Sequence, residues 1–132
     1  MTCFWDGIIN QLCPEDYAKI GFNPPANANE LVILLKHFNR KTPCVRWNGT
    51  GLTPKQMEEN LEHISSFNVH SIHNGYDCSI CDPFLLLVTD LFELEIRHRY
   101  LGVHTMVYQP CIRVPIRRII RFTSDQGHFM SE

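Results

Sequence analysis

The sequence predicts an α+β fold in which N-terminal helices pack on an antiparallel sheet. Helical periodicity and helix-capping signals occupy the chain up to about residue 92, and three segments with strand-like character follow. The 132 residues are enough for one hydrophobic core, and 44% hydrophobic with 20% charged residues is ordinary for a globular protein. We therefore expect a single domain over residues 1–132.

Four helices are expected. The first begins at Cys3, carries its apolar side chains at helical spacing and ends before Pro14, because a residue that precedes proline is disfavoured in a helix. Capping residues followed by helix-forming patterns predict the other three helices, over 30–39 after Asn29, over 54–66 after Thr53 and over 83–92 after Asp82.

The expected strands lie mainly in the C-terminal third. Apolar and charged residues alternate over 94–100, and residues 103–108 and 116–122 are further strand candidates. Residues 69–73 are a candidate for a short strand. We expect His128 at the turn that enters one more strand.

No membrane span is expected, because the longest strongly apolar run, 84–88, is far shorter than the roughly 20 residues that cross a bilayer. Asp6 lies where a secretory signal carries basic residues, which disfavours export. The six cysteines are interpreted as free thiols of a reducing compartment, since a chain of this size does not need disulfides to fold.

Cys3 is the candidate nucleophile. A thiol at a helix start lies in the partial positive charge of the helix dipole, which favours the thiolate. The unpaired amides of the first helical turn can also stabilise an oxyanion. A cysteine nucleophile needs a base, and His128, expected at the edge of the sheet, is the best candidate.

These residues support a family resemblance. Residues 3–9, Cys-Phe-Trp-Asp-Gly-Ile-Ile, resemble the helix start that carries the nucleophile in papain-like viral proteases. Residues 119–122 followed by Gly-His-Phe at 127–129 are similar to the strand and histidine that end the ovarian-tumour (OTU) family, and 82–100 resemble the helix and strand that precede them.

The resemblance implies a papain-like, OTU-type cysteine protease, with Cys3 and His128 as a catalytic dyad or part of a triad. It implies ubiquitin or a ubiquitin-like modifier as partner, or a viral polyprotein, and the host cytoplasm as location. Met130 stands where the family often has Asn or Asp. The orienting group is therefore left open among Asp125, Ser131 and Glu132.

The substrate of such an enzyme is an extended, basic tail. Acidic and aromatic side chains near the expected site are candidates to line its channel, and no cofactor is expected. The candidates are Trp5, Asp6, Asp77, Asp82 and Phe129.

The alternative is a protein-interaction domain without catalysis, which is either stabilised by a structural zinc ion or free of metal. The zinc ligands would be His70, His73, Cys78 and Cys81, which are zinc-binding residue types. In a strand the two histidines would point to opposite faces, which argues against this set.

Nucleic-acid binding is a third reading, because six arginines and no acidic residue lie in 96–124. The sequence pI of about 6.4 disfavours it. The arginines also alternate with apolar residues, which is typical of a solvated sheet face that pairs with Glu93 and Glu95.

Overall fold

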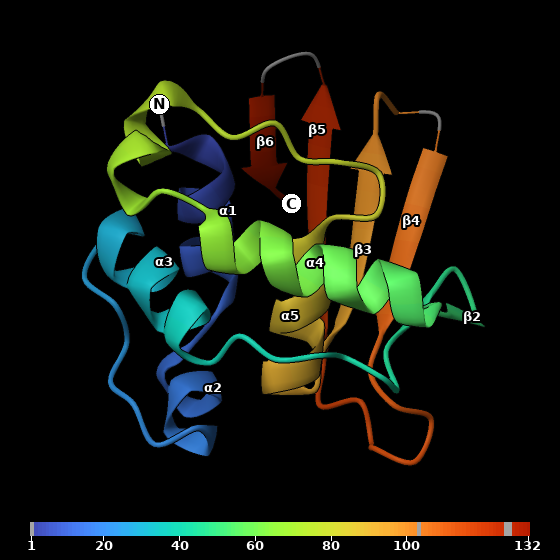
Figure 1. Ribbon diagram of the computed structural model, residues 1–132. Coiled ribbons are helices and arrows are strands. Elements are labelled where there is room, and N and C mark those ends of the chain that lie inside the picture. Colours follow the sequence, from blue (N-terminus) through green and yellow to red (C-terminus); the bar gives the residue numbers. More distant parts are fainter. Residues whose placement is uncertain (1, 103, 126–127) are drawn as a thin grey trace.

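The chain forms an α+β fold of helices and one mixed sheet (Figure 1). The computed structural model describes residues 2–102, 104–125 and 128–132. Its helices are α1 (Cys3–Gln11), α2 (Pro14–Lys19), α3 (Ala28–His37), α4 (Pro54–Ser66) and α5 (Pro83–Phe92), with a 3-10 helix η1 (Val69–Asn74). Its strands are β1 (Arg46–Trp47), β2 (Thr50–Gly51), β3 (Glu95–Tyr100), β4 (His104–Gln109), β5 (Ile119–Asp125) and β6 (His128–Ser131). Val103 and Gly127, expected in a strand and in a motif, lie outside the described residues.

The six strands form one sheet in the order β2-β1-β4-β3-β5-β6. Neighbouring strands are antiparallel except β3 and β5, which run parallel. The expectation of an antiparallel sheet is therefore wrong at this pair. The connection from β4 returns to the start of β3, where the Arg117 amide donates to the Glu93 carbonyl oxygen and the Glu95 amide donates to that of Arg118, both at 3.1 Å. β5 consequently begins beside the start of β3 and runs in the same direction.

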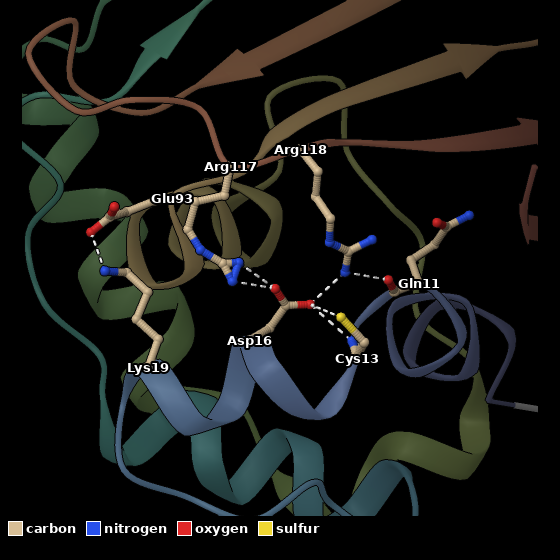
Figure 2. Close-up of polar contacts among 7 residues, drawn as sticks. All are labelled: Gln11, Cys13, Asp16, Lys19, Glu93, Arg117 and Arg118. Atoms are coloured by element: carbon tan, nitrogen blue, oxygen red, sulfur yellow. Dashed lines mark hydrogen bonds and ion pairs between the residues drawn. The ribbon is translucent and has the colours of Figure 1, made fainter.

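A buried carboxylate attaches that returning connection to α2 (Figure 2). Asp16 is fully buried and accepts hydrogen bonds from both terminal nitrogens of Arg117, each at 2.6 Å, and from Arg118. The Cys13 amide at the start of α2 donates to the same carboxylate at 2.8 Å. Burial raises the pKa of Asp16, but the hydrogen bonds from Arg118 and Cys13 outweigh it, so the pKa is lowered. Asp16 is therefore an ionised anchor for the two arginines.

α5 lies between α4 and the sheet, and Figure 1 shows α4 crossing over it. Residues 84–88 of α5, the longest strongly apolar run of the sequence, are all buried, as is typical of a helix that is apolar on all sides. The predicted cap is also present: the Asp82 carboxylate accepts the amides of Phe84 at 2.9 Å and Leu85 at 3.4 Å. The start of α5 is thus fixed by a buried acidic side chain, whose pKa is raised by its burial.

Local signals predicted some elements well and others poorly. The Thr53 hydroxyl and the Gln56 side chain accept each other's backbone amides, at 3.1 and 2.8 Å, and α4 begins where this capping box predicts. Asn27 rather than Asn29 caps α3, which begins two residues earlier than expected. The strand expected over 69–73 is wrong, because this segment forms η1.

α1 packs directly against β6, although the two are at opposite ends of the chain. Gly7 of α1 allows the close approach: a Cβ atom at this position would lie 3.0 Å from the Phe129 ring. The Phe4 ring also packs at a tilt against the Phe129 ring, with centroids 4.8 Å apart. The start of α1 is thereby placed beside the β5–β6 hairpin.

Candidate functional site

A cavity of about 280 Å³ lies where the start of α1 meets the ends of β3, β5 and β6. Segment 75–78, between η1 and α5, forms another wall. The lining residues are Cys3, Phe4, Gly75, Tyr76, Asp77, Cys78, Tyr100, Ser124, Asp125, His128 and Phe129. The expected nucleophile and the expected base therefore line the same cavity.

Cys3 is the first residue of α1 and is half-buried. The amides of the first turn have no carbonyl partner within the helix. Thr2 precedes the helix without capping it, and its hydroxyl donates to the Asp6 carboxylate at 2.6 Å. The thiol thus lies at the start of a nine-residue helix, and the buried side chain of its neighbour Phe4 anchors this helix start in the core.

His128 is the first residue of β6 and is exposed. Asp125, the last residue of β5, is its cross-strand partner, and such partners have Cβ atoms about 4.5–5.5 Å apart. Within the described part of the chain, the structure records no hydrogen bond between the Cys3 thiol and the His128 ring. Catalytic hydrogen bonds are often long without substrate and tighten when it binds.

Of the three candidates for an orienting group, Asp125 alone lines the cavity. Ser131 pairs with Phe122, three positions along β6 from His128, which is about 10 Å at the rise of a strand. Glu132 follows Ser131 and forms an ion pair with Arg99 at 2.5 Å. The geometry therefore favours Asp125.

A buried histidine that sequence reasoning did not select lies beneath the cavity. The His98 ring is fully buried, with Nε2 2.6 Å from the Ser124 hydroxyl and Nδ1 3.9 Å from the Cys78 sulfur. Burial lowers the pKa of His98 to about 4, so the ring is neutral at pH 7. The available signal was its place on the apolar face of β3. The neutral ring thus contacts two side chains that line the cavity, Ser124 and Cys78.

Tyr76 forms a second support. Its ring packs on Phe4 with centroids 4.5 Å apart, and its hydroxyl donates to the Asp82 carboxylate at 2.8 Å. The ring also meets His63, whose Nε2 lies 3.2 Å from the hydroxyl. These contacts fix the wall of the cavity that faces the start of α1.

The expected channel residues divide into three groups. Asp77 and Phe129 line the cavity. Trp5 and Asp82 are fully buried, so neither side chain presents a surface to a substrate. Asp6 is exposed on α1, with its carboxylate engaged by Thr2.

The zinc alternative finds no supporting geometry. Across residues 2–102, 104–125 and 128–132, no group of three or more His, Cys, Asp or Glu could hold a metal ion. His70 and His73 lie on η1. Burial raises the pKa of Cys78 above its ordinary range and that of Cys81 to about 11. All six cysteines are free.

Ion pairs account for much of the basic C-terminal quarter. Arg97 pairs with Glu95 at 2.7 Å, Arg99 pairs with Glu132, and Asp16 holds two more arginines. The expected partner Glu93 pairs instead with Lys19, at 2.6 Å. These contacts leave less free positive charge for phosphates than the sequence alone implies.

No helix in the described ranges combines the length and apolar character needed to cross a membrane.

Comparisons with known proteins do not assign the chain to a family. No protein-family model matches the chain, and comparisons with curated proteins and with solved structures gave no significant match.

Proposed function

We propose that this protein is a cysteine protease of the papain-like, OTU-type class, with Cys3 as nucleophile and His128 as general base and acid. The observation that carries the proposal is the shared cavity. Two residues 125 positions apart, selected for their chemistry, line one pocket of about 280 Å³ together with Asp125. Asp125 would orient the histidine.

In the proposed reaction the Cys3 thiol gives its proton to His128, and the sulfur attacks the carbonyl carbon of the scissile bond. First-turn amides of α1 donate to the oxyanion of the tetrahedral intermediate. The C–N bond breaks as His128 returns the proton to the leaving amine, which leaves a thioester. Water then loses a proton to His128 and attacks the thioester, and the sulfur regains its proton as the C–S bond breaks.

The proposed substrate is the C-terminal tail of ubiquitin or a ubiquitin-like modifier, or a viral polyprotein junction, in the host cytoplasm. Asp77 and Asp125 place acidic side chains on the cavity wall, which suits a basic residue near the scissile bond. This substrate class follows from the resemblance of residues 3–9 and 127–129 to viral and OTU proteases.

The test is reaction with ubiquitin that bears a thiol-reactive group at its C-terminus, read by intact mass. Wild type is expected to form one adduct and Cys3→Ala none. Cys78→Ser is the matched control, because it removes another thiol that lines the same cavity and is expected to keep the adduct. Failure of the wild type to react, or an adduct that persists in Cys3→Ala, argues for a binding domain without catalysis.

A second measurement does not depend on the modifier. The rate of Cys3 alkylation by iodoacetamide near neutral pH reports how much thiolate is present. His128→Ala is expected to slow it severalfold, and Asp125→Asn to slow it less. Equal rates in wild type and His128→Ala contradict the proposed dyad.

A further inference from the structure

Two cysteines face each other where the pairing of β1 with β4 ends. Arg46 lies opposite Gln109 in the last pair of this antiparallel ladder, and Cys44 and Cys111 each lie two positions beyond that pair on the two neighbouring segments. Paired residues of such a ladder have Cα atoms about 4.5–5.5 Å apart, so the two segments start from a separation close to the roughly 4.4–6.8 Å that a disulfide spans. The two thiols share a hydrogen bond and are not linked.

Each cysteine also lies in a short turn. The Val45 amide donates to the Thr42 carbonyl oxygen at 3.4 Å, and the Val114 amide donates to that of Cys111 at 2.8 Å. Val45, between Cys44 and the first residue of β1, is fully buried and anchors this side of the pair. Both cysteines are therefore held in place by local backbone structure.

The surroundings differ for the two sulfurs. The Arg113 backbone and the Cys44 thiol form hydrogen bonds that lower the pKa of Cys111, and the charges of Arg113 and Arg46 lower it further. The contact with Cys111 raises the pKa of Cys44. Cys44 is exposed and Cys111 is half-buried, so small solutes reach the pair.

We propose that Cys44 and Cys111 are a redox modification site, which a hydroperoxide converts into a reversible disulfide. The Cys111 thiolate attacks the O–O bond of the hydroperoxide, which gives the sulfenic acid and, after protonation, water or an alcohol. The Cys44 sulfur then attacks the sulfenic sulfur, the S–O bond breaks, and the hydroxyl group leaves as water with the proton of the Cys44 thiol. Two thiols are oxidised and one hydroperoxide is reduced. A thiol reductant restores both cysteines by exchange.

The experiment treats the folded chain with hydrogen peroxide, blocks the remaining thiols and digests with trypsin. Cleavage after Lys41, Arg46, Arg99 and Arg113 leaves Cys44 in peptide 42–46 and Cys111 in peptide 100–113. The two peptides are expected to appear joined, lighter than their sum by two hydrogen atoms, and to separate on reduction. Cys3→Ala is expected to keep the link, which separates this site from the proposed nucleophile.

Two variants test the assigned order of events. Cys44→Ser is expected to leave Cys111 as a sulfenic acid that dimedone traps, and Arg113→Gln to slow disulfide formation severalfold because it removes a nearby positive charge. The proposal is overturned if peroxide leaves peptides 42–46 and 100–113 unlinked, whether the thiols remain intact or Cys111 becomes a sulfinic acid. It is also overturned if Cys44 pairs equally with the other cysteines.

Discussion

The buried ring of His98 predicts a specific loss of stability in mild acid. The folded protein keeps this ring neutral, because burial lowers its pKa from an ordinary value of 6.5 to about 4. The unfolded chain takes up the proton below about pH 6.5. Stability is therefore fully present above that pH and falls as the pH drops towards 4, where the folded protein also binds the proton.

The magnitude follows from this difference. Each unit of pKa corresponds to about 1.4 kcal/mol, so the full effect is about 3 kcal/mol, of which about 2 kcal/mol appears between roughly pH 7 and pH 5. His98→Gln keeps a polar side chain next to Ser124 but does not titrate in this range. The free energy of unfolding of the variant is expected to fall about 2 kcal/mol less than that of the wild type between these pH values.

Urea denaturation of both proteins at the two pH values measures this difference, and other titrating groups cancel in the comparison. Ser124→Ala is the informative control. It removes the 2.6 Å contact to Nε2, yet burial is the cause of the shift, so the wild-type pH dependence is expected to remain. If wild type and His98→Gln lose stability equally, within about 0.5 kcal/mol, the ring is not held neutral in the folded protein.

Three further substitutions test the packing by urea denaturation near pH 7. Asp16→Asn removes the negative charge that two arginines share, and it is expected to lower the free energy of unfolding by about 2–4 kcal/mol. An unchanged free energy of unfolding would mean that the two arginines are equally well satisfied by water. The contribution of Asp16 requires its ionised form, so it is present at neutral pH and is lost as the pH falls through the lowered pKa. Gly7→Ala is expected to destabilise by about 1 kcal/mol, since the clash with the Phe129 ring exceeds the gain in helix propensity, and a stabilised variant contradicts this. Thr53→Ala removes the cap of α4 and is expected to cost about 1 kcal/mol; an unchanged midpoint shows that the cap is dispensable.

The elements that the sequence predicted well are those whose signals are local. Thr53 with Gln56 and Asp82 with Pro83 define helix starts through contacts within one turn. α2 was missed because it has only six residues and is held by the tertiary contacts of Asp16. The parallel pairing of β3 with β5 was missed for a similar reason, since it depends on where a nine-residue connection is anchored.

In the candidate site, too, the residues with local signals could be predicted and those placed by tertiary contacts could not. Cys3 and His128 stand out individually, because the chemistry of a helix-start thiol and of a base can be read from residue type and position. Tyr76 and Ser124 have no such local signal, and His98 has only its place on the apolar face of β3, so all three join the site through the fold. The same limit explains why Trp5 and Asp82 were expected near substrate: sequence spacing does not show which side of a helix start is covered.

The geometry of the proposed dyad depends on how α1 packs against the C-terminal strands. The C-terminal end of α1 is held by the Gln11 side chain, which donates to the carbonyl oxygens of Arg121 and Glu132 at 3.1 and 3.0 Å. At the other end of the helix, the position of Cys3 relative to His128 depends on how closely the helix lies on β6. Gly7 and Phe129 determine that distance, because a methyl group on Gly7 would already touch the ring at 3.0 Å. Phe129 stands next to His128, so a displacement of its ring also shifts the backbone of the proposed base. Gly7→Ala should accordingly slow Cys3 alkylation more than its modest cost in stability explains, whereas Thr53→Ala, with a similar cost in α4, should leave the rate unchanged.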